Sequence, residues 1–84
     1  MVEEYWLHGI LHRENGPASI VYNADGSISA EVYYHKNKIS NYKGPAVIYY
    51  NNGVTSSCYY YIDGISYEKP QWEKIILNKK INTL

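Results

Sequence analysis

The chain has 84 residues, which fits one domain, 1–84, with a thin hydrophobic core. Eight basic and eight acidic side chains give a formal net charge of zero, and this balance argues against a strong electrostatic footprint for nucleic acid or anionic membrane. The single cysteine, Cys58, excludes an intramolecular disulfide, and no apolar run approaches the roughly 20 residues that span a bilayer, so we expect a soluble protein of the cytoplasm.

Taken in order, residues 3–8 are expected to form a strand, and His8-Gly9 a two-residue hairpin turn, because glycine accepts positive φ. The chain returns through 10–12 and a polar link into residues 16–23, which begin Gly-Pro-Ala. Pro17 lacks a backbone N–H and therefore belongs at the start of a strand.

The segment 27–35 alternates in the period of a β-strand. The set expected to face the core is Ile28, Ala30, Val32 and Tyr34. The set expected to face away from it is Ser29, Glu31, Tyr33 and His35.

A second copy of the pattern follows. Lys36-Asn37 takes the place of His8-Gly9, and residues 44–51 repeat the Gly-Pro-Ala segment 28 residues after the first. We call 16–23 and 44–51 the first and second arm. A period in this range indicates repeats that pack on their neighbours.

The third copy is incomplete. Residues 54–62 repeat the long strand, and Asp63-Gly64 supplies the third short turn. The pattern then changes to helical spacing at Trp72, Ile75 and Ile76. We expect a helix over about 68–80, which would cap the last repeat, and a tail over 81–84.

These elements predict a mainly β fold: an antiparallel meander of β-hairpin repeats forming one curved, twisted sheet, with a short C-terminal capping helix. About two and a half repeats occupy residues 5–67. This is below the three or so that a repeat array usually needs, which leaves a homodimer or a partner as a source of added stability.

The run from Trp6 to Ala18, Trp-Leu-His-Gly-Ile-Leu-His-Arg-Glu-Asn-Gly-Pro-Ala, resembles the MORN-like repeats of large DNA viruses, phages and bacteria. The resemblance extends to about Trp72 and implies stacked hairpins in a protein that binds other proteins. The second copy departs from the family pattern, with Ser40-Asn41-Tyr42 in place of His12-Arg13-Glu14.

No residue pattern points to catalysis, a cofactor or a metal. His12, Arg13 and Glu14 are adjacent on a link, without a second converging acid or base, so we expect a structural tether. No zinc-ligand spacing occurs among the candidate ligands His8, His12, His35, Cys58 and Asp63.

The leading functional hypothesis is a non-catalytic protein-binding module from a phage, virus or bacterium. It would inhibit a host enzyme such as a defence nuclease, in the manner of an anti-CRISPR protein, or act on a toxin as an antitoxin. The expected contact residues are aromatic, together with one histidine: Tyr33, His35, Tyr59, Tyr60, Tyr61 and Trp72. The competing interpretation of this surface is a homodimer interface.

Two other classes stay open at this point. Tyrosine-lined strands can stack single-stranded bases, and Lys36, Lys38 and Lys43 could contact phosphates. A structural or assembly protein is the third hypothesis.

Overall fold

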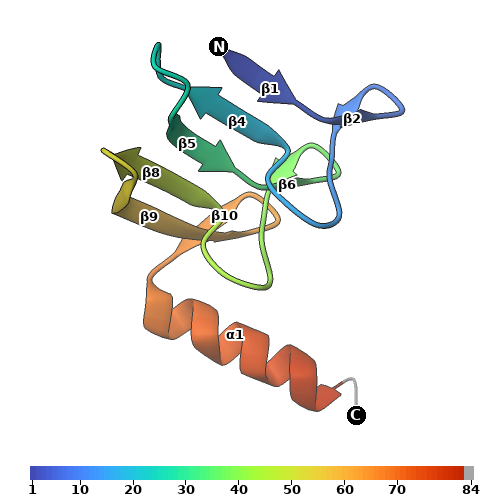
Figure 1. Ribbon diagram of the computed structural model, residues 1–84. Helices are drawn as coiled ribbons and strands as arrows, with labels where there is room; N and C mark the ends of the chain where they lie inside the picture. Colours follow the sequence, from blue (N-terminus) through green and yellow to red (C-terminus); the bar gives the residue numbers. More distant parts are fainter. Residues whose placement is uncertain (83–84) are drawn as a thin grey trace.

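The computed structural model describes residues 1–82, of which the side chains up to Lys79 are placed. Figure 1 shows strands followed by one C-terminal helix, α1 (Lys69–Asn82). Six strands form one open antiparallel sheet in the order β1 (Val2–Glu4), β4 (Ser19–Tyr22), β5 (Ile28–Val32), β8 (Val47–Asn51), β9 (Val54–Ile62) and β10 (Ile65–Tyr67). Two short hairpins stand apart from it: β2 (Trp6–Leu7) with β3 (Ile10–Leu11), and β6 (Tyr34–His35) with β7 (Lys38–Ile39). The predicted fold class, an antiparallel meander with a C-terminal helix, is confirmed.

The hairpin turns form where the sequence predicts them. His8 and Gly9 have φ of 51° and 81°, and Lys36 and Asn37 have 50° and 70°. Positive φ at both central residues is the type I′ geometry, whose twist matches that of paired strands. Asp63-Gly64 repeats it, with φ of 50° and 84°.

Two predicted strands are each divided. Residues 3–8 break at Tyr5 and residues 27–35 break at Tyr33. At each break the tyrosine N–H donates to an arm, at Ala18 or Ala46, while its carbonyl accepts an N–H from the returning link. The chain therefore leaves the main sheet at this residue and enters its own hairpin, which the alternation of side chains does not reveal. The third copy has no arm, and β9 runs through Tyr60 without a break.

The core is thin and lies on both faces of the sheet. Ala18 and Ala46 are fully buried, which confirms their close packing between repeats. Ile20 pairs with Glu31, so it lies on the face opposite to Ala30. The other buried apolar residues are Val47, Ile62 and Trp72.

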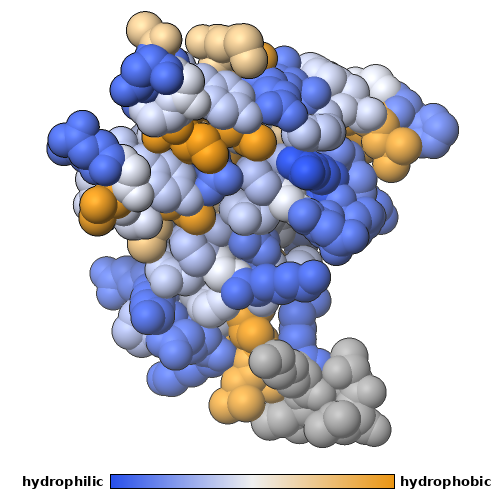
Figure 2. All heavy atoms as spheres, in the orientation of Figure 1, coloured by the Kyte–Doolittle hydropathy of each residue, from blue (hydrophilic) through white to orange (hydrophobic). Residues whose placement is uncertain are grey.

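The predicted core-facing set of the third strand segment is only partly correct. Ala30 is buried, but Ile28, Val32 and Tyr34 are half-buried. A single-layer sheet has no second layer to cover one face completely, so side chains remain partly exposed on both sides. Figure 2 shows the result on one face, where apolar side chains form small patches separated by polar ones.

Each repeat is bonded to the turn of the next. Asn37 N–H donates to Leu11 C=O at 3.0 Å, and Gly64 N–H donates to Ile39 C=O at 2.8 Å. The links are tied internally in the same way: Arg13 Nη1 donates to Pro17 C=O. In the second copy Asn41 Nδ2 donates to Pro45 C=O. The predicted tethering of the link by Arg13 is thus observed.

The helix is longer than predicted. It begins at Lys69 and continues to Asn82, so the first half of the predicted tail is helical, while 83–84 lie outside the described residues. The Glu68 N–H donates to the Gln71 side chain at 3.3 Å, which satisfies one free donor at the helix start. Within residues 1–82, no helix has the length and apolar character needed to cross a bilayer.

Candidate functional site

The tyrosines predicted as one contact surface are divided between the two faces of the sheet. Tyr60 pairs with Tyr67 and Tyr59 with Val47 across successive positions of β9, so their side chains point in opposite directions. The side chain of Tyr61 points to the same face of the sheet as that of Tyr59. Tyr59 is 50% exposed and packs edge-on against Tyr49, with ring centroids 6.1 Å apart.

Trp72 anchors α1 to the sheet. Its ring lies 4.9 Å from that of Tyr60, and its Nε1–H donates to Asn41 C=O at 3.1 Å. Trp72 is 9% exposed, so a partner has little direct access to it. Its role in the structure is to fix the start of the helix against the last repeat.

A hollow surface surrounds the second link. Three adjoining depressions of about 580, 220 and 350 Å³ share Lys43, and Tyr42 separates the first two. We call this surface the Tyr42 groove, and define it by six of its lining residues: Tyr33, His35, Tyr42, Lys43, Trp72 and Ile76.

Tyr42 is held from two sides. Its hydroxyl donates to Asp63 at 3.3 Å, and Lys79 Nζ lies 4.7 Å from the ring centroid. Burial raises the pKa of Tyr33, and the nearby Glu31 carboxylate adds to this effect. The groove therefore combines phenols with the charged side chains of Lys43, Glu14 and Glu73.

Sequence reasoning did not select Tyr42 as a contact residue. A signal for it exists, because Tyr42 occupies the place that Glu14 has in the first copy. A position where two otherwise similar repeats differ in chemistry is a candidate for function.

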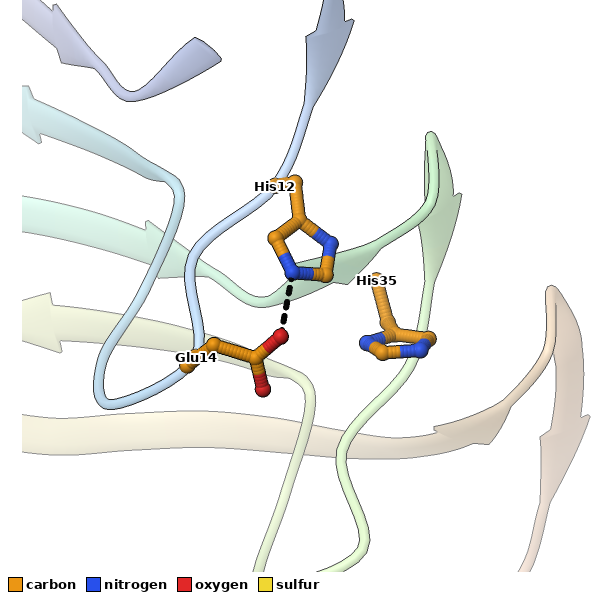
Figure 3. Close-up of side chains that lie close together, drawn as sticks. All are labelled: His12, Glu14 and His35. Atoms are coloured by element: carbon orange, nitrogen blue, oxygen red, sulfur yellow. Dashed lines mark hydrogen bonds and ion pairs between the residues drawn. The ribbon is translucent and has the colours of Figure 1, made fainter. Parts of the chain in front are cut away.

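A polar cluster joins the first link to the second hairpin (Figure 3). His12 Nε2 lies 2.6 Å from Glu14 Oε1, and the His35 ring centroid is 4.8 Å from that of His12. The hydrogen bond from His12 lowers the pKa of Glu14, and the charge of Lys36 acts in the same direction. One ligand atom from each of the three residues lies within 4.8 Å of the others, a spacing that suggests a metal site.

The hydrogen bonds of His12 argue against that use. Its Nδ1 accepts the backbone N–H of Lys36 at 3.0 Å. A neutral imidazole then carries its proton on Nε2 and donates it to Glu14. A histidine that binds a metal through Nε2 normally keeps the proton on Nδ1, where it would face the Lys36 N–H. The cluster is built to hold the link, and the zinc candidates His8, Cys58 and Asp63 lie elsewhere.

A second polar feature occurs twice on the sheet. Tyr5 and Tyr22 both donate to Glu3, and these bonds lower the pKa of Glu3. In the next repeat Tyr50 donates to Glu31, which raises the pKa of Tyr50 to about 12. In both repeats a carboxylate accepts hydrogen bonds from phenols, an arrangement that stabilises the sheet surface.

The lysines proposed for nucleic-acid contact come from two segments of the second repeat. Lys36 and Lys38 are exposed near the turn of the second hairpin, whereas Lys43 is exposed on the following link and lines the Tyr42 groove.

Comparisons of the chain with protein-family models, with curated proteins and with solved structures each gave no match.

Proposed function

We propose that the chain is a non-catalytic protein-binding module built from MORN-like repeats, and that the Tyr42 groove is its contact surface. The observation that carries this proposal is that three depressions adjoin one another around Lys43. Aromatic side chains from the second hairpin, the second link and the helix line the first two of them. Partly exposed tyrosines held in fixed positions supply contact area at low entropic cost, as is typical of binding surfaces.

The polar clusters favour binding over catalysis. His12 and Glu14 are bonded to each other, and His12 is also fixed by the Lys36 amide. A general acid and base would instead converge on a shared substrate position with opposed pKa shifts.

A folded protein fits the groove better than a nucleic acid does. Lys43 is the basic residue that all three depressions share, and the Glu14 and Glu73 carboxylates also line them. These carboxylates would repel a phosphate backbone, whereas a protein surface of mixed charge can place basic groups opposite them. Inhibition of a host enzyme, a nuclease complex or a toxin is the biological role we propose for such a small neutral protein.

The experiment is quantitative affinity capture from lysate of the encoding cell or its host, with wild type and three variants side by side. Tyr33→Ala and Tyr42→Ala remove groove aromatics, and Tyr49→Ala removes an exposed tyrosine of β8 that lines none of the three depressions, as a matched control. We expect one protein to be captured by wild type and Tyr49→Ala and lost from both groove variants. Equal capture by all four proteins would contradict the assignment of the groove.

The oligomeric state must be measured in the same experiment. If wild type is a dimer by light scattering and Tyr33→Ala makes it a monomer, the groove is a homodimer interface. Binding of oligonucleotides that weakens steeply with salt, and with loss of Lys36, Lys38 and Lys43, would instead support the nucleic-acid hypothesis.

A further inference from the structure

One edge of the main sheet is unpaired over most of a strand. On one side, residues 54–59 of β9 pair with β8. On its other side it pairs with β10, and this contact extends only from Tyr60 to Ile62. In residues 1–82, no strand pairs with the outer side of 54–59.

The two preceding repeats fill this position with their own arms. Glu3 in β1 pairs with Ile20 of the first arm, and Glu31 in β5 pairs with Ile48 of the second. Cys58 is the equivalent residue of β9, and Ile48 is its partner on the inner side. A third arm would lie on the outer side of Cys58, but the chain continues into α1 instead.

The chemistry of this edge leaves it open to another strand. Residues 54–59 read Val-Thr-Ser-Ser-Cys-Tyr, with no charge and no proline, and Val54 is 69% exposed. Proteins usually protect sheet edges with charged side chains, proline or a bulge. Of these, residues 54–59 carry a register shift against β8 that skips Ser56, whereas Ser57, Cys58 and Tyr59 pair regularly. The opposite edge, β1, carries Glu3 and Glu4 within its three residues.

We propose that the outer edge of β9 binds an extended segment of a partner protein as an added antiparallel strand. The two arms define the chemistry of that segment: they share the pattern Ala-x-Ile-x-Tyr, as Ala18-Ser19-Ile20-Val21-Tyr22 and Ala46-Val47-Ile48-Tyr49-Tyr50. The inference rests on the proposed protein-binding function and assigns a second contact to it.

A single strand fits this edge better than a second copy of the chain. The helix lies beyond β9 on the side of the free edge (Figure 1). If a second copy paired with β9, the rest of its sheet would collide with α1. A single added strand needs only the space that a third arm would occupy. Pairing of β1 with β1 of another copy would bring four glutamates together, which is unfavourable.

The test uses a fluorescent peptide of residues 44–51 and the full chain, with fluorescence anisotropy as the readout. Cys58→Lys adds a charge at the free edge, and Cys58→Pro removes the backbone donor that points outward. Val2→Lys is the matched control, because it adds the same charge at the β1 edge. We expect saturable binding to wild type and to Val2→Lys, weakened by roughly tenfold or more in both Cys58 variants.

Cys58→Lys keeps the test valid if Cys58→Pro fails to fold, which far-ultraviolet circular dichroism would show. A scrambled peptide that binds equally, or no binding at about 1 mM peptide, would overturn the proposal. A wild-type dimer that Cys58→Lys converts to monomer would also overturn it, by making a second copy the occupant. Tyr42→Ala should still bind the peptide, so failure at the groove and failure at this edge are distinguishable.

Discussion

The Nδ1 atom of His12 accepts the backbone N–H of Lys36 at 3.0 Å, across the boundary between the first and second repeats. One repeat later, the Ser40 hydroxyl accepts the backbone N–H of Asp63, also at 3.0 Å. Both acceptors are buried, with His12 7% and Ser40 4% exposed. Two chemically different side chains thus satisfy the same turn donor of the following repeat.

Removal of either acceptor should destabilise the fold. His12→Ala and Ser40→Ala each leave a turn N–H without its partner, and we expect a loss of about 1–3 kcal/mol in the free energy of unfolding. His12→Ser should lose less than His12→Ala, because a hydroxyl already serves this position in the second repeat. Urea denaturation measures these values, with Ser66→Ala, at an exposed position of β10, as control. A loss for Ser40→Ala no larger than that for Ser66→Ala would show that the bond contributes nothing.

The glycines that open the two arms should respond differently to alanine. A Cβ at Gly16 would lie 3.1 Å from Arg13 Cζ, whereas the nearest atom at Gly44 is 4.0 Å away. Arg13 is held by the Tyr5 ring, 3.9 Å from its centroid, and by Pro17 C=O. Gly16→Ala should displace the guanidinium and cost about 1–2 kcal/mol.

Gly44→Ala is the matched control and should change stability by no more than about 0.5 kcal/mol. The measurement is thermal or urea unfolding of the two single variants, of Arg13→Ala and of the Arg13→Ala/Gly16→Ala double variant. Because both changes act through the same guanidinium, the double variant should lose less than the sum of the singles. Strict additivity would show that Gly16 acts without Arg13.

The turns and arms were predictable because each depends on a local requirement. Glycine or asparagine at Gly9, Asn37 and Gly64 allows the second positive φ of a two-residue hairpin. Gly16 and Gly44 each end a bend that leads into an arm, and neither has positive φ. Their conformation is one that other residues adopt, so the requirement at Gly16 is space for Arg13.

The candidate site was less predictable because it depends on contacts between repeats. Tyr59 and Tyr60 were predicted on one contact surface, although successive residues of a strand point to opposite faces. The sequence also does not say that Trp72 packs against Tyr60 and that Tyr42 lines the groove. The approach of His12 to His35 also depends on how one hairpin stacks on the next. Spacing along the chain carries no information on that stacking.

Zinc should not stabilise the protein, although two histidines and a glutamate lie together. Coordination by His12 Nε2 would require it to release the proton it donates to Glu14 while Nδ1 stays occupied by Lys36 N–H. We expect equimolar Zn²⁺ to change the Tm by less than about 1 °C, since a ligand that does not bind the native state gives no stabilisation. A rise in Tm that disappears in both His12→Ala and His35→Ala would show that the Lys36 bond opens to admit a metal.

The phenol of Tyr50 should link stability to alkaline pH. Its hydrogen bond to Glu31 raises its pKa to about 12 from 10.0, which favours the protonated form in the folded state. This contribution is complete below pH 10 and is lost as the pH rises towards 12, because the unfolded phenol then ionises first. Tyr50→Phe should therefore unfold more easily than wild type at neutral pH, and the difference should shrink above pH 10. Tyrosinate absorbance gives a second readout: Tyr50→Phe should lose the latest ionisation phase, whereas Tyr59→Phe should keep it. If Tyr50→Phe retains that phase, the bond to Glu31 does not control the ionisation of Tyr50.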